Sequence, residues 1–281
     1  MPYVPRVLIA GCGDLGSRVG VLMARHGWQV QGLRRQVAHL PPEITPLAVD
    51  LNQPQAPSDW PEVSPDYLLY AAAAERSDVA AYEAAYVLGL RHVLAWLAEH
   101  GQRPRRLLFV SSTAVYGQDQ GEWVDETSPC EPQGFTGQIM LQAEQTAFNS
   151  ELPATVVRLA GLYDGHSRWL LDQLRAGQLP AGQPPLYSNR LHRDDAAELL
   201  ASLLLADAEG KPLESVYLGV DDEPAPLLEV ALWLRARCGI DTPPSALMQR
   251  RTGSKRCSNA RARSLGWTPR YPSYRDGYAN V

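Results

Sequence analysis

Three glycines near the start of the chain, Gly11, Gly13 and Gly16, have the spacing Gly-x-Gly-x-x-Gly. A short apolar run, residues 7–10, precedes them, and an amphipathic stretch, residues 14–27, follows them. In this context the first glycine permits a tight turn, the second lets the backbone approach a pyrophosphate, and the third lets the helix lie close to the strand. Phosphates bind well at a helix N-terminus, where N–H groups and the helix dipole favour anions. The pattern therefore predicts a dinucleotide site with contacts from Gly11, Gly13, Asp14, Leu15 and Gly16.

Short apolar runs alternate with longer amphipathic stretches over the first 160 residues. This alternation is typical of βαβ units and a parallel sheet. After about residue 161 the pattern changes to helical stretches separated by segments rich in proline and glycine. We predict an α/β fold, a Rossmann doubly wound parallel sheet in residues 1–160, with a small integrated C-terminal substrate lobe in residues 161–281. The expected strands are residues 7–10, 29–33, 46–49, 67–71, 107–110, 155–159 and 215–220, and the expected helices are residues 14–27, 78–101, 166–176, 193–207 and 226–238.

The charge composition is skewed toward arginine. The 26 basic residues are 24 arginines and two lysines, Lys211 and Lys255, against 31 acidic residues. Mixed charge with a net value of −5 predicts no nucleic-acid partner. The four cysteines and six histidines show no metal-ligand spacing, which predicts no metal site. No apolar run approaches the roughly 20 residues of a membrane span, so we expect a cytoplasmic protein with no membrane contact.

The end of the second expected strand bears on cofactor choice. An NAD-selective site usually places a carboxylate there to bind the ribose hydroxyl groups. Here the chain has Arg34 and Arg35, and a guanidinium group can bind a 2′-phosphate with two hydrogen bonds. We therefore predict NADP in preference to NAD. The alternative is that both arginines are solvated surface residues.

The segment from Leu107 to Gly117, Leu-Leu-Phe-Val-Ser-Ser-Thr-Ala-Val-Tyr-Gly, carries a family resemblance. It resembles the fifth-strand signature of the extended short-chain dehydrogenase/reductases, the NAD-dependent epimerase/dehydratase family, which acts largely on nucleotide sugars. Residues 129–132, 158–163 and 189–195 resemble further family segments, and residues 258–272 resemble an atypical bacterial subgroup. The resemblance covers essentially the whole chain, and dimerisation through the fourth and fifth helices is common in the family.

The resemblance implies roles for named residues. It implies that Asp50 and Leu51 lie near the adenine, that residues 71–74 line the cofactor, and that Ser112 orients the substrate. A substrate other than a sugar is also possible, because the C-terminal lobe supplies aromatic and cationic groups that would suit a phosphorylated or nucleotide-linked ligand. Alternatively, the tryptophan packs internally and the arginines pair with Asp194 or Asp195. The implied cofactor residues include Ala71, Ala72, Ala73 and Ser111, and the implied substrate residues are Arg158, Tyr163, Arg190 and His192, with Trp169 and Tyr187 beside them.

The sequence departs from this family at its catalytic pair. The family's Tyr-x-x-x-Lys aligns with Thr136 and Met140, and its asparagine on the fourth helix aligns with Tyr86. A lysine one helical turn after a tyrosine lowers the pKa of the phenol and holds the nicotinamide ribose. With lysines at 211 and 255, the motif would need tyrosine at 207 or 251, which are Asp207 and Arg251. The pair is therefore absent from the chain in any alignment.

Two classes of function remain open at this point. The first is an NADP-dependent oxidoreductase or epimerase-like enzyme, acting on a nucleotide-sugar-like or small carbonyl substrate. Its acid or base would be Tyr116, Tyr163 or His192, which are the substitutes that the sequence offers. Hydride transfer can survive loss of the pair, because the cofactor carries the difficult chemistry. The second class is a non-catalytic NADP-binding sensor or scaffold protein.

Overall fold

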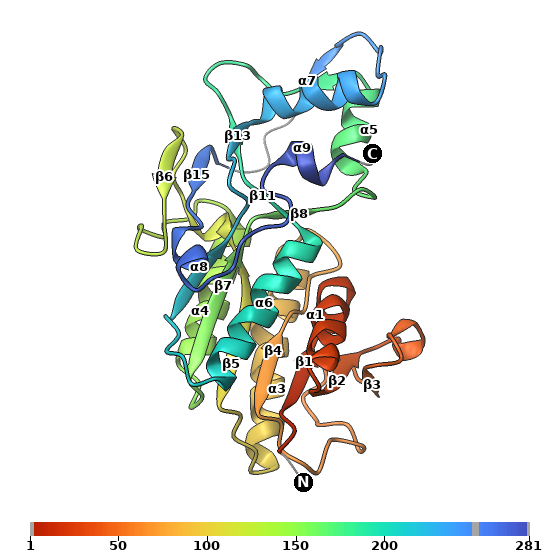
Figure 1. Cartoon of the computed structure of the whole chain (residues 1–281), viewed down its shortest axis with the longest axis vertical. Helices are drawn as coiled ribbons and strands as arrows, with labels where there is room; N and C mark the ends of the chain where they lie inside the picture. Colours follow the sequence, from red (N-terminus) through yellow and green to blue (C-terminus); the bar gives the residue numbers. More distant parts are fainter. Residues whose placement is uncertain (1–2, 249–252, 280–281) are drawn as a thin grey trace. The chain divides into compact units, whose positions relative to one another are not determined.

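The computed structural model describes residues 3–248 and 253–279. Seven strands form one sheet in the order β12-β7-β5-β4-β1-β2-β3, and the pairs from β5 to β3 are parallel (Figure 1). The strand order reverses beside β1, as in a doubly wound sheet, so the predicted fold class is confirmed. The strands span Arg6–Ala10 (β1), Gln29–Arg34 (β2), Thr45–Ala48 (β3), Tyr67–Tyr70 (β4), Arg106–Ser112 (β5), Ala154–Leu159 (β7) and Val216–Gly219 (β12).

Helices connect and cover these strands (Figure 1). The first helix begins at Asp14 and ends at Arg25; Gly27 then adopts a positive φ of 82°, the conformation that commonly follows a helix C-terminus. The longer helices span Asp14–Arg25 (α1), Gly89–Glu99 (α3), Phe135–Phe148 (α4), Trp169–Arg175 (α5), Arg193–Ala208 (α6) and Leu227–Arg237 (α7), and the shorter ones span Val37–His39 (η1), Val79–Tyr82 (α2), Glu83–Leu88 (η2), Thr113–Val115 (η3), Ala260–Ser264 (α8) and Tyr274–Gly277 (α9).

The predicted helix at residues 78–101 contains a π-helical turn, η2, between α2 and α3. We attribute this π-helical turn to a side chain that binds a backbone carbonyl of the helix. The Tyr70 hydroxyl donates a hydrogen bond of 2.5 Å to the Ala85 carbonyl oxygen. A Cβ atom at Gly89 would lie 2.5 Å from that same hydroxyl oxygen, so this glycine makes room for Tyr70. Insertion of a side chain into the hydrogen-bond ladder is a recognised cause of such distortions.

The chain forms two compact units. Unit 1 contains residues 1–115, 132–158 and 197–217, and therefore most of the large sheet. Unit 2 contains residues 116–131, 159–196 and 218–281.

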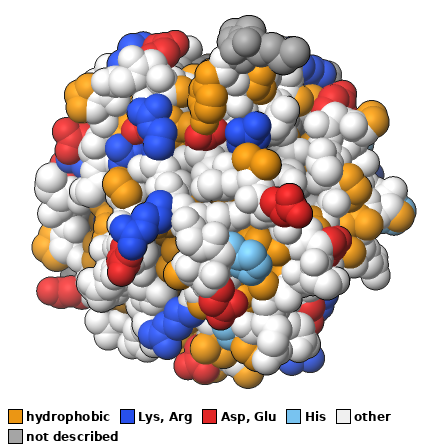
Figure 2. Space-filling view, turned by 90° about the horizontal axis from the view of Figure 1, so that it is seen from below, with side chains coloured by type: hydrophobic (Ala, Val, Ile, Leu, Met, Phe, Trp, Pro, Cys, Tyr) orange, Lys and Arg blue, Asp and Glu red, His pale blue; other side chains and the backbone are white. Residues whose placement is uncertain are grey.

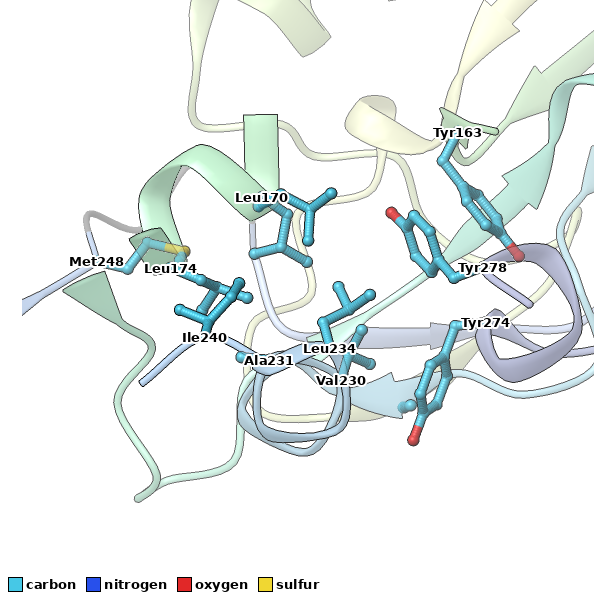
Figure 3. Close-up of a cluster of buried hydrophobic side chains, with 12 residues drawn as sticks. Tyr163, Leu170, Leu174, Val230, Ala231, Leu234, Ile240, Met248, Tyr274 and Tyr278 are labelled. Atoms are coloured by element: carbon cyan, nitrogen blue, oxygen red, sulfur yellow. The ribbon is translucent and has the colours of Figure 1, made fainter. Parts of the chain in front are cut away.

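The core of unit 2 is a cluster of buried apolar side chains from α5, α7, α9 and the segments between them (Figure 3). Leu171 and Leu234 are buried in it, and the rings of Tyr163 and Tyr278 lie 4.5 Å apart. Unit 2 also contains pairs of short strands whose partners are far apart in sequence. These strands span Glu122–Val124 (β6), Gly161–Tyr163 (β8), Gln178–Leu179 (β9), Tyr187–Ser188 (β10), Arg190–His192 (β11), Ala225–Pro226 (β13), Ala246–Leu247 (β14) and Lys255–Cys257 (β15).

The surface carries charges of both signs. Figure 2 shows basic and acidic side chains interspersed over one face. Within residues 3–248 and 253–279, no helix is long and apolar enough to cross a membrane. In the same residues, no group of three or more His, Cys, Asp or Glu side chains is arranged to hold a metal ion.

A buried ionic network joins three elements of unit 1. Arg158 on β7 donates to both carboxylate oxygens of Glu144 on α4, at 3.0 and 2.7 Å. The Ser111 hydroxyl on β5 donates a third hydrogen bond to Glu144 at 2.5 Å. All three residues are buried, so each charge depends on the other for compensation.

Removing one member of this network should therefore destabilise the protein. We expect Glu144→Ala to lower the free energy of unfolding by about 3–5 kcal/mol, because it removes the carboxylate that compensates the buried Arg158 charge. The double variant Glu144→Met with Arg158→Met should be closer to the wild type, and Gln145→Ala on the exposed side of α4 is the control. Urea unfolding measures all four proteins. A Glu144→Ala protein as stable as the control would show that the pair contributes nothing.

Candidate functional site

The glycine loop of unit 1 follows β1 and leads directly into α1. Gly11 has a φ of 77°, and both Gly11 and Cys12 donate backbone hydrogen bonds to the Leu33 carbonyl oxygen, at 3.1 and 2.9 Å. A Cβ atom at Gly11 would lie 2.4 Å from the backbone nitrogen of Ala72, so a larger residue cannot fit without a shift of the backbone. A Cβ atom at Gly16 would lie 3.0 Å from the Ile9 side chain. The tight turn and the close helix packing predicted from the spacing are therefore present.

The middle glycine faces open space. The nearest atom to a Cβ at Gly13 would be the Gly11 carbonyl oxygen, 3.9 Å away. Beside it α1 begins with no side-chain cap, and the first amides of any helix lack partners within the helix. Room beside a helix N-terminus without a side-chain cap fits the pyrophosphate of a dinucleotide.

Further predicted cofactor residues lie at or after the carboxyl ends of β2, β3 and β4. Arg34 ends β2, and the Arg35 guanidinium forms a salt bridge with Glu75. The hydrogen bond that the Arg35 guanidinium donates to the Glu75 carboxylate raises the pKa of Arg35. The Asp50 carboxylate accepts a hydrogen bond of 3.0 Å from the Asn52 amide. The sequence prediction missed Glu75, because nothing in its position signals a partner 40 residues away.

The carboxyl end of β5 meets the first turn of α4. The Ser112 hydroxyl accepts a hydrogen bond of 3.1 Å from the Ala114 amide, and a Cβ at Gly137 would lie 2.3 Å from the Ala114 carbonyl oxygen. This contact holds Thr136, partly buried, in the turn next to Gly137. Met140, one turn further on, is 4 % exposed. The two residues at the family's Tyr and Lys positions thus provide neither a titratable phenol nor a cation.

Ser111 and Arg158 both bond to Glu144, as described above. Their predicted roles toward cofactor and substrate stay predictions, and the network gives both residues a structural task.

The predicted substitutes for the missing acid lie in unit 2. The Tyr116 hydroxyl donates to the Asp125 carbonyl oxygen at 2.8 Å, and the Tyr163 hydroxyl donates to the Ser273 carbonyl oxygen at 3.2 Å. Burial raises the pKa of Tyr163. The ring of His192 lies between Tyr271, at 3.9 Å, and Tyr163, at 5.6 Å. The structure thus places the rings of Tyr163 and His192 in contact. Their catalytic roles stay predictions.

The remaining lobe residues have varied surroundings. Arg190 is buried and donates a hydrogen bond of 2.7 Å to the Ser188 hydroxyl. Trp169 is 45 % exposed at the start of α5. The Arg256 guanidinium lies 4.9 Å from the Tyr187 ring. Asp195 accepts hydrogen bonds from the amides of Arg270 and Tyr271, so it fastens the C-terminal segment to the start of α6.

Asp221, a carboxyl group of unit 2 that the sequence prediction missed, has a strongly raised pKa. Its side chain is 1 % exposed, and its Oδ2 atom has no hydrogen-bond partner among the described residues. Burial raises the pKa of Asp221 to about 8, although the positive charge of Arg190 opposes the rise. Adjacent Asp221 and Asp222 after an apolar run gave no signal that the first of them is buried.

The parallel sheet, the glycine loop and the uncapped start of α1 define a Rossmann-type α/β protein. The chain belongs to the family described as the RmlD substrate binding domain, whose model matches residues 5–223. The resemblance to NAD-dependent epimerase/dehydratases is confirmed.

Several known proteins are similar over the whole length. A Streptomyces protein named 3-diazoavenalumate denitrifying reductase is 27% identical, covering 97% of this chain and 98% of its own. A solved structure from Methylobacillus flagellatus, provisionally described as an NAD-dependent epimerase/dehydratase, is 33% identical with a TM-score of 0.82, covering 99% of this chain and 97% of its own. The Bordetella bronchiseptica enzyme WbmG, solved in complex with NAD, shares the fold at 19% identity and a TM-score of 0.76, covering 99% and 92%.

The raised pKa of Asp221 predicts a pH-dependent stability. A carboxyl group that binds its proton more tightly in the folded state stabilises the fold fully below its unfolded pKa of about 4, and this contribution is lost as the pH rises to about 8. Asp221→Asn mimics the protonated acid at every pH. We therefore expect its melting temperature, relative to that of the wild type, to increase as the pH rises from about 4 to about 8. Exposed Asp241→Asn is the control.

Thermal unfolding from pH 4 to pH 9 measures the difference. If the stability difference between Asp221→Asn and wild type does not change with pH, the carboxyl group is ionised in the folded protein.

Proposed function

We propose that this protein is an NADP(H)-dependent reductase that acts on a small carbonyl or nucleotide-sugar-like substrate without the Tyr-Lys pair of its relatives. The observation behind this proposal is the glycine loop, in which Gly13 has no side chain and leaves room beside the N-terminus of α1, which has no side-chain cap. Two similar proteins support the proposal. The Streptomyces relative, similar from end to end, is named a reductase, and the Bordetella enzyme of the same fold was solved with NAD.

In this proposal, different residues of unit 1 bind different parts of the cofactor. Backbone amides at the start of α1 bind the pyrophosphate, Arg34 and Arg35 bind the 2′-phosphate, and Asp50 with Leu51 lies near the adenine. Ala71, Ala72 and Ala73 lie along the dinucleotide, because Ala72 contacts Gly11 directly. A bound reduced nicotinamide supplies a hydride. Ser112 then orients the acceptor at the end of β5.

Reduction is favoured over epimerisation by the residues at the family's catalytic positions. Neither Thr136 nor Met140 titrates near neutral pH, and an epimerisation needs a group that both takes and returns a proton. A reduction needs a single proton donor. The name of the Streptomyces relative denotes a reduction with loss of nitrogen from a diazo compound, so acceptors with a leaving group belong among the substrates to test. The cytoplasmic location and the homodimer stay predictions.

Cofactor choice is tested by fluorescence titration with NADPH and NADH. We expect NADPH to bind at least roughly tenfold more tightly, since hydrogen bonds to a charged group contribute about 1.5–3 kcal/mol. Arg34→Ala should remove most of this preference, whereas Arg25→Ala, at the other end of α1, should leave it intact. Tighter binding of NADH by the wild type would refute the assignment of NADP.

Turnover is tested by following the absorbance of NADPH with a panel of sugar nucleotides, small aldehydes and ketones, and aryl diazo compounds. We expect stoichiometric oxidation of NADPH with at least one class. Gly11→Ala should abolish it, because the added Cβ would overlap Ala72. Tight binding of NADPH without consumption across the panel would favour the alternative, a sensor or scaffold.

A further inference from the structure

Tyr86 lies at the same edge of unit 1 as the glycine loop. Its hydroxyl oxygen accepts a hydrogen bond from the backbone of Ala74. Ala72, two residues before Ala74, is the residue against which Gly11 packs. The phenol of Tyr86 therefore stands at the carboxyl end of β4, beside the segment that we assign to the cofactor.

The π-helical turn fixes this position of Tyr86. The Ala85 carbonyl, directly before Tyr86, is bonded to the Tyr70 hydroxyl, and Gly89 leaves the space for it. A π-helical turn rotates the residues within it relative to an α-helix, and such turns occur frequently at functional sites. A distortion held by a buried tyrosine and a glycine thus aims one partly exposed phenol at the strand edge.

Aromatic contacts extend from Tyr86 to the first turn of α4. The Tyr86 and Tyr82 rings lie 5.2 Å apart, and the Tyr82 and Phe135 rings lie 5.4 Å apart. Phe135 is the first residue of α4 and precedes Thr136. The two tyrosines therefore bridge the carboxyl end of β4 and the helix turn in which the relatives' tyrosine is missing.

We propose that Tyr86 is the proton donor of the reduction, an inference that rests on the proposed function. As a carbonyl carbon accepts the hydride, its oxygen gains the electron pair of the C=O bond and takes the proton from Tyr86 Oη. The O–H bond of the phenol breaks, and water reprotonates the tyrosinate. The carbonyl compound is reduced to an alcohol while NADPH is oxidised.

The surroundings suit an acid rather than a base. Burial raises the pKa of Tyr86, and the nearby Tyr82 raises it further. The titratable groups that interact with it are the phenols of Tyr82 and, from β4, Tyr70. The bond from Ala74 is accepted by the oxygen, so it leaves the hydroxyl proton to be donated. In contrast, the hydroxyl protons of Tyr116 and Tyr163 are donated to backbone carbonyls of unit 2.

The proposal is tested without turnover by NMR of protein carrying ¹³Cζ-labelled tyrosine. Spectra are titrated from about pH 8 to pH 12 in the NADP⁺ and the NADPH complexes, and Tyr86→Phe assigns the signal. An oxidised nicotinamide carries a positive charge that a reduced one lacks, and a charge within about 4–6 Å shifts a pKa by about one unit or more. We expect the pKa of Tyr86 to be lower by about one unit with NADP⁺ than with NADPH. The Tyr82→Phe variant should keep this difference.

An equal pKa for Tyr86 in both complexes, or a shift at another tyrosine instead, would overturn the role of Tyr86 while leaving the reductase proposal standing. If neither NADP⁺ nor NADPH binds, both the reductase proposal and the role of Tyr86 are overturned.

A kinetic test follows with any carbonyl acceptor found in the panel. We expect Tyr86→Phe to lower kcat about 10²–10⁴-fold while the affinity for NADPH and KM change little. Tyr217→Phe is the matched control, because the Tyr217 hydroxyl accepts a hydrogen bond from the Glu214 amide and belongs to no proposed site; it should keep kcat. An unchanged kcat for Tyr86→Phe with a ketone substrate would refute the proposal.

Discussion

The contact between Gly11 and Ala72 is the constraint on which the candidate site depends. It joins the ends of two neighbouring parallel strands, β1 and β4, so closely that a single added carbon would overlap the backbone. Because the strands are parallel, everything that follows them emerges at one edge: the glycine loop, the alanine segment and, through Ala74, the phenol of Tyr86. The proposed chemistry is therefore concentrated within unit 1.

Much of unit 1 could be predicted from the sequence, because its strands are short buried runs and its helices carry clear apolar periodicity. Each of the seven expected strands corresponds to an observed one, within two residues at either end. What could not be predicted depends on contacts distant in sequence. The π-helical turn follows from the Tyr70 hydroxyl, β6 forms only by pairing with β15, and Glu144 finds Arg158 and Ser111 in the folded chain. In the candidate site, the glycine loop could be predicted from the spacing of its glycines. The salt bridge of Glu75, the burial of Asp221 and the orientation of Tyr86 could not, because they depend on the folded chain.

The scarcity of lysine has a structural counterpart. Met140, at the position that aligns with the lysine of the family's Tyr-x-x-x-Lys motif, is buried as an apolar side chain. Lys255 is also buried, but its ammonium group donates to the Tyr116 carbonyl oxygen in unit 2. The interactions that shift the pKa of Tyr86 include no cation, and burial raises it, so this phenol keeps its proton for donation during a reduction. The absence of the Tyr-Lys pair is thus compatible with catalysis of the reduction.

The central claim is that unit 1 binds a nicotinamide dinucleotide across the carboxyl edge of its sheet. A crystal structure of the protein with NADP⁺ tests it most directly. We expect the pyrophosphate within hydrogen-bond distance of the amides at the start of α1, with the nicotinamide facing Tyr86 and Ser112. A dinucleotide bound elsewhere, or a loop that stays empty at saturating NADP⁺, would contradict it.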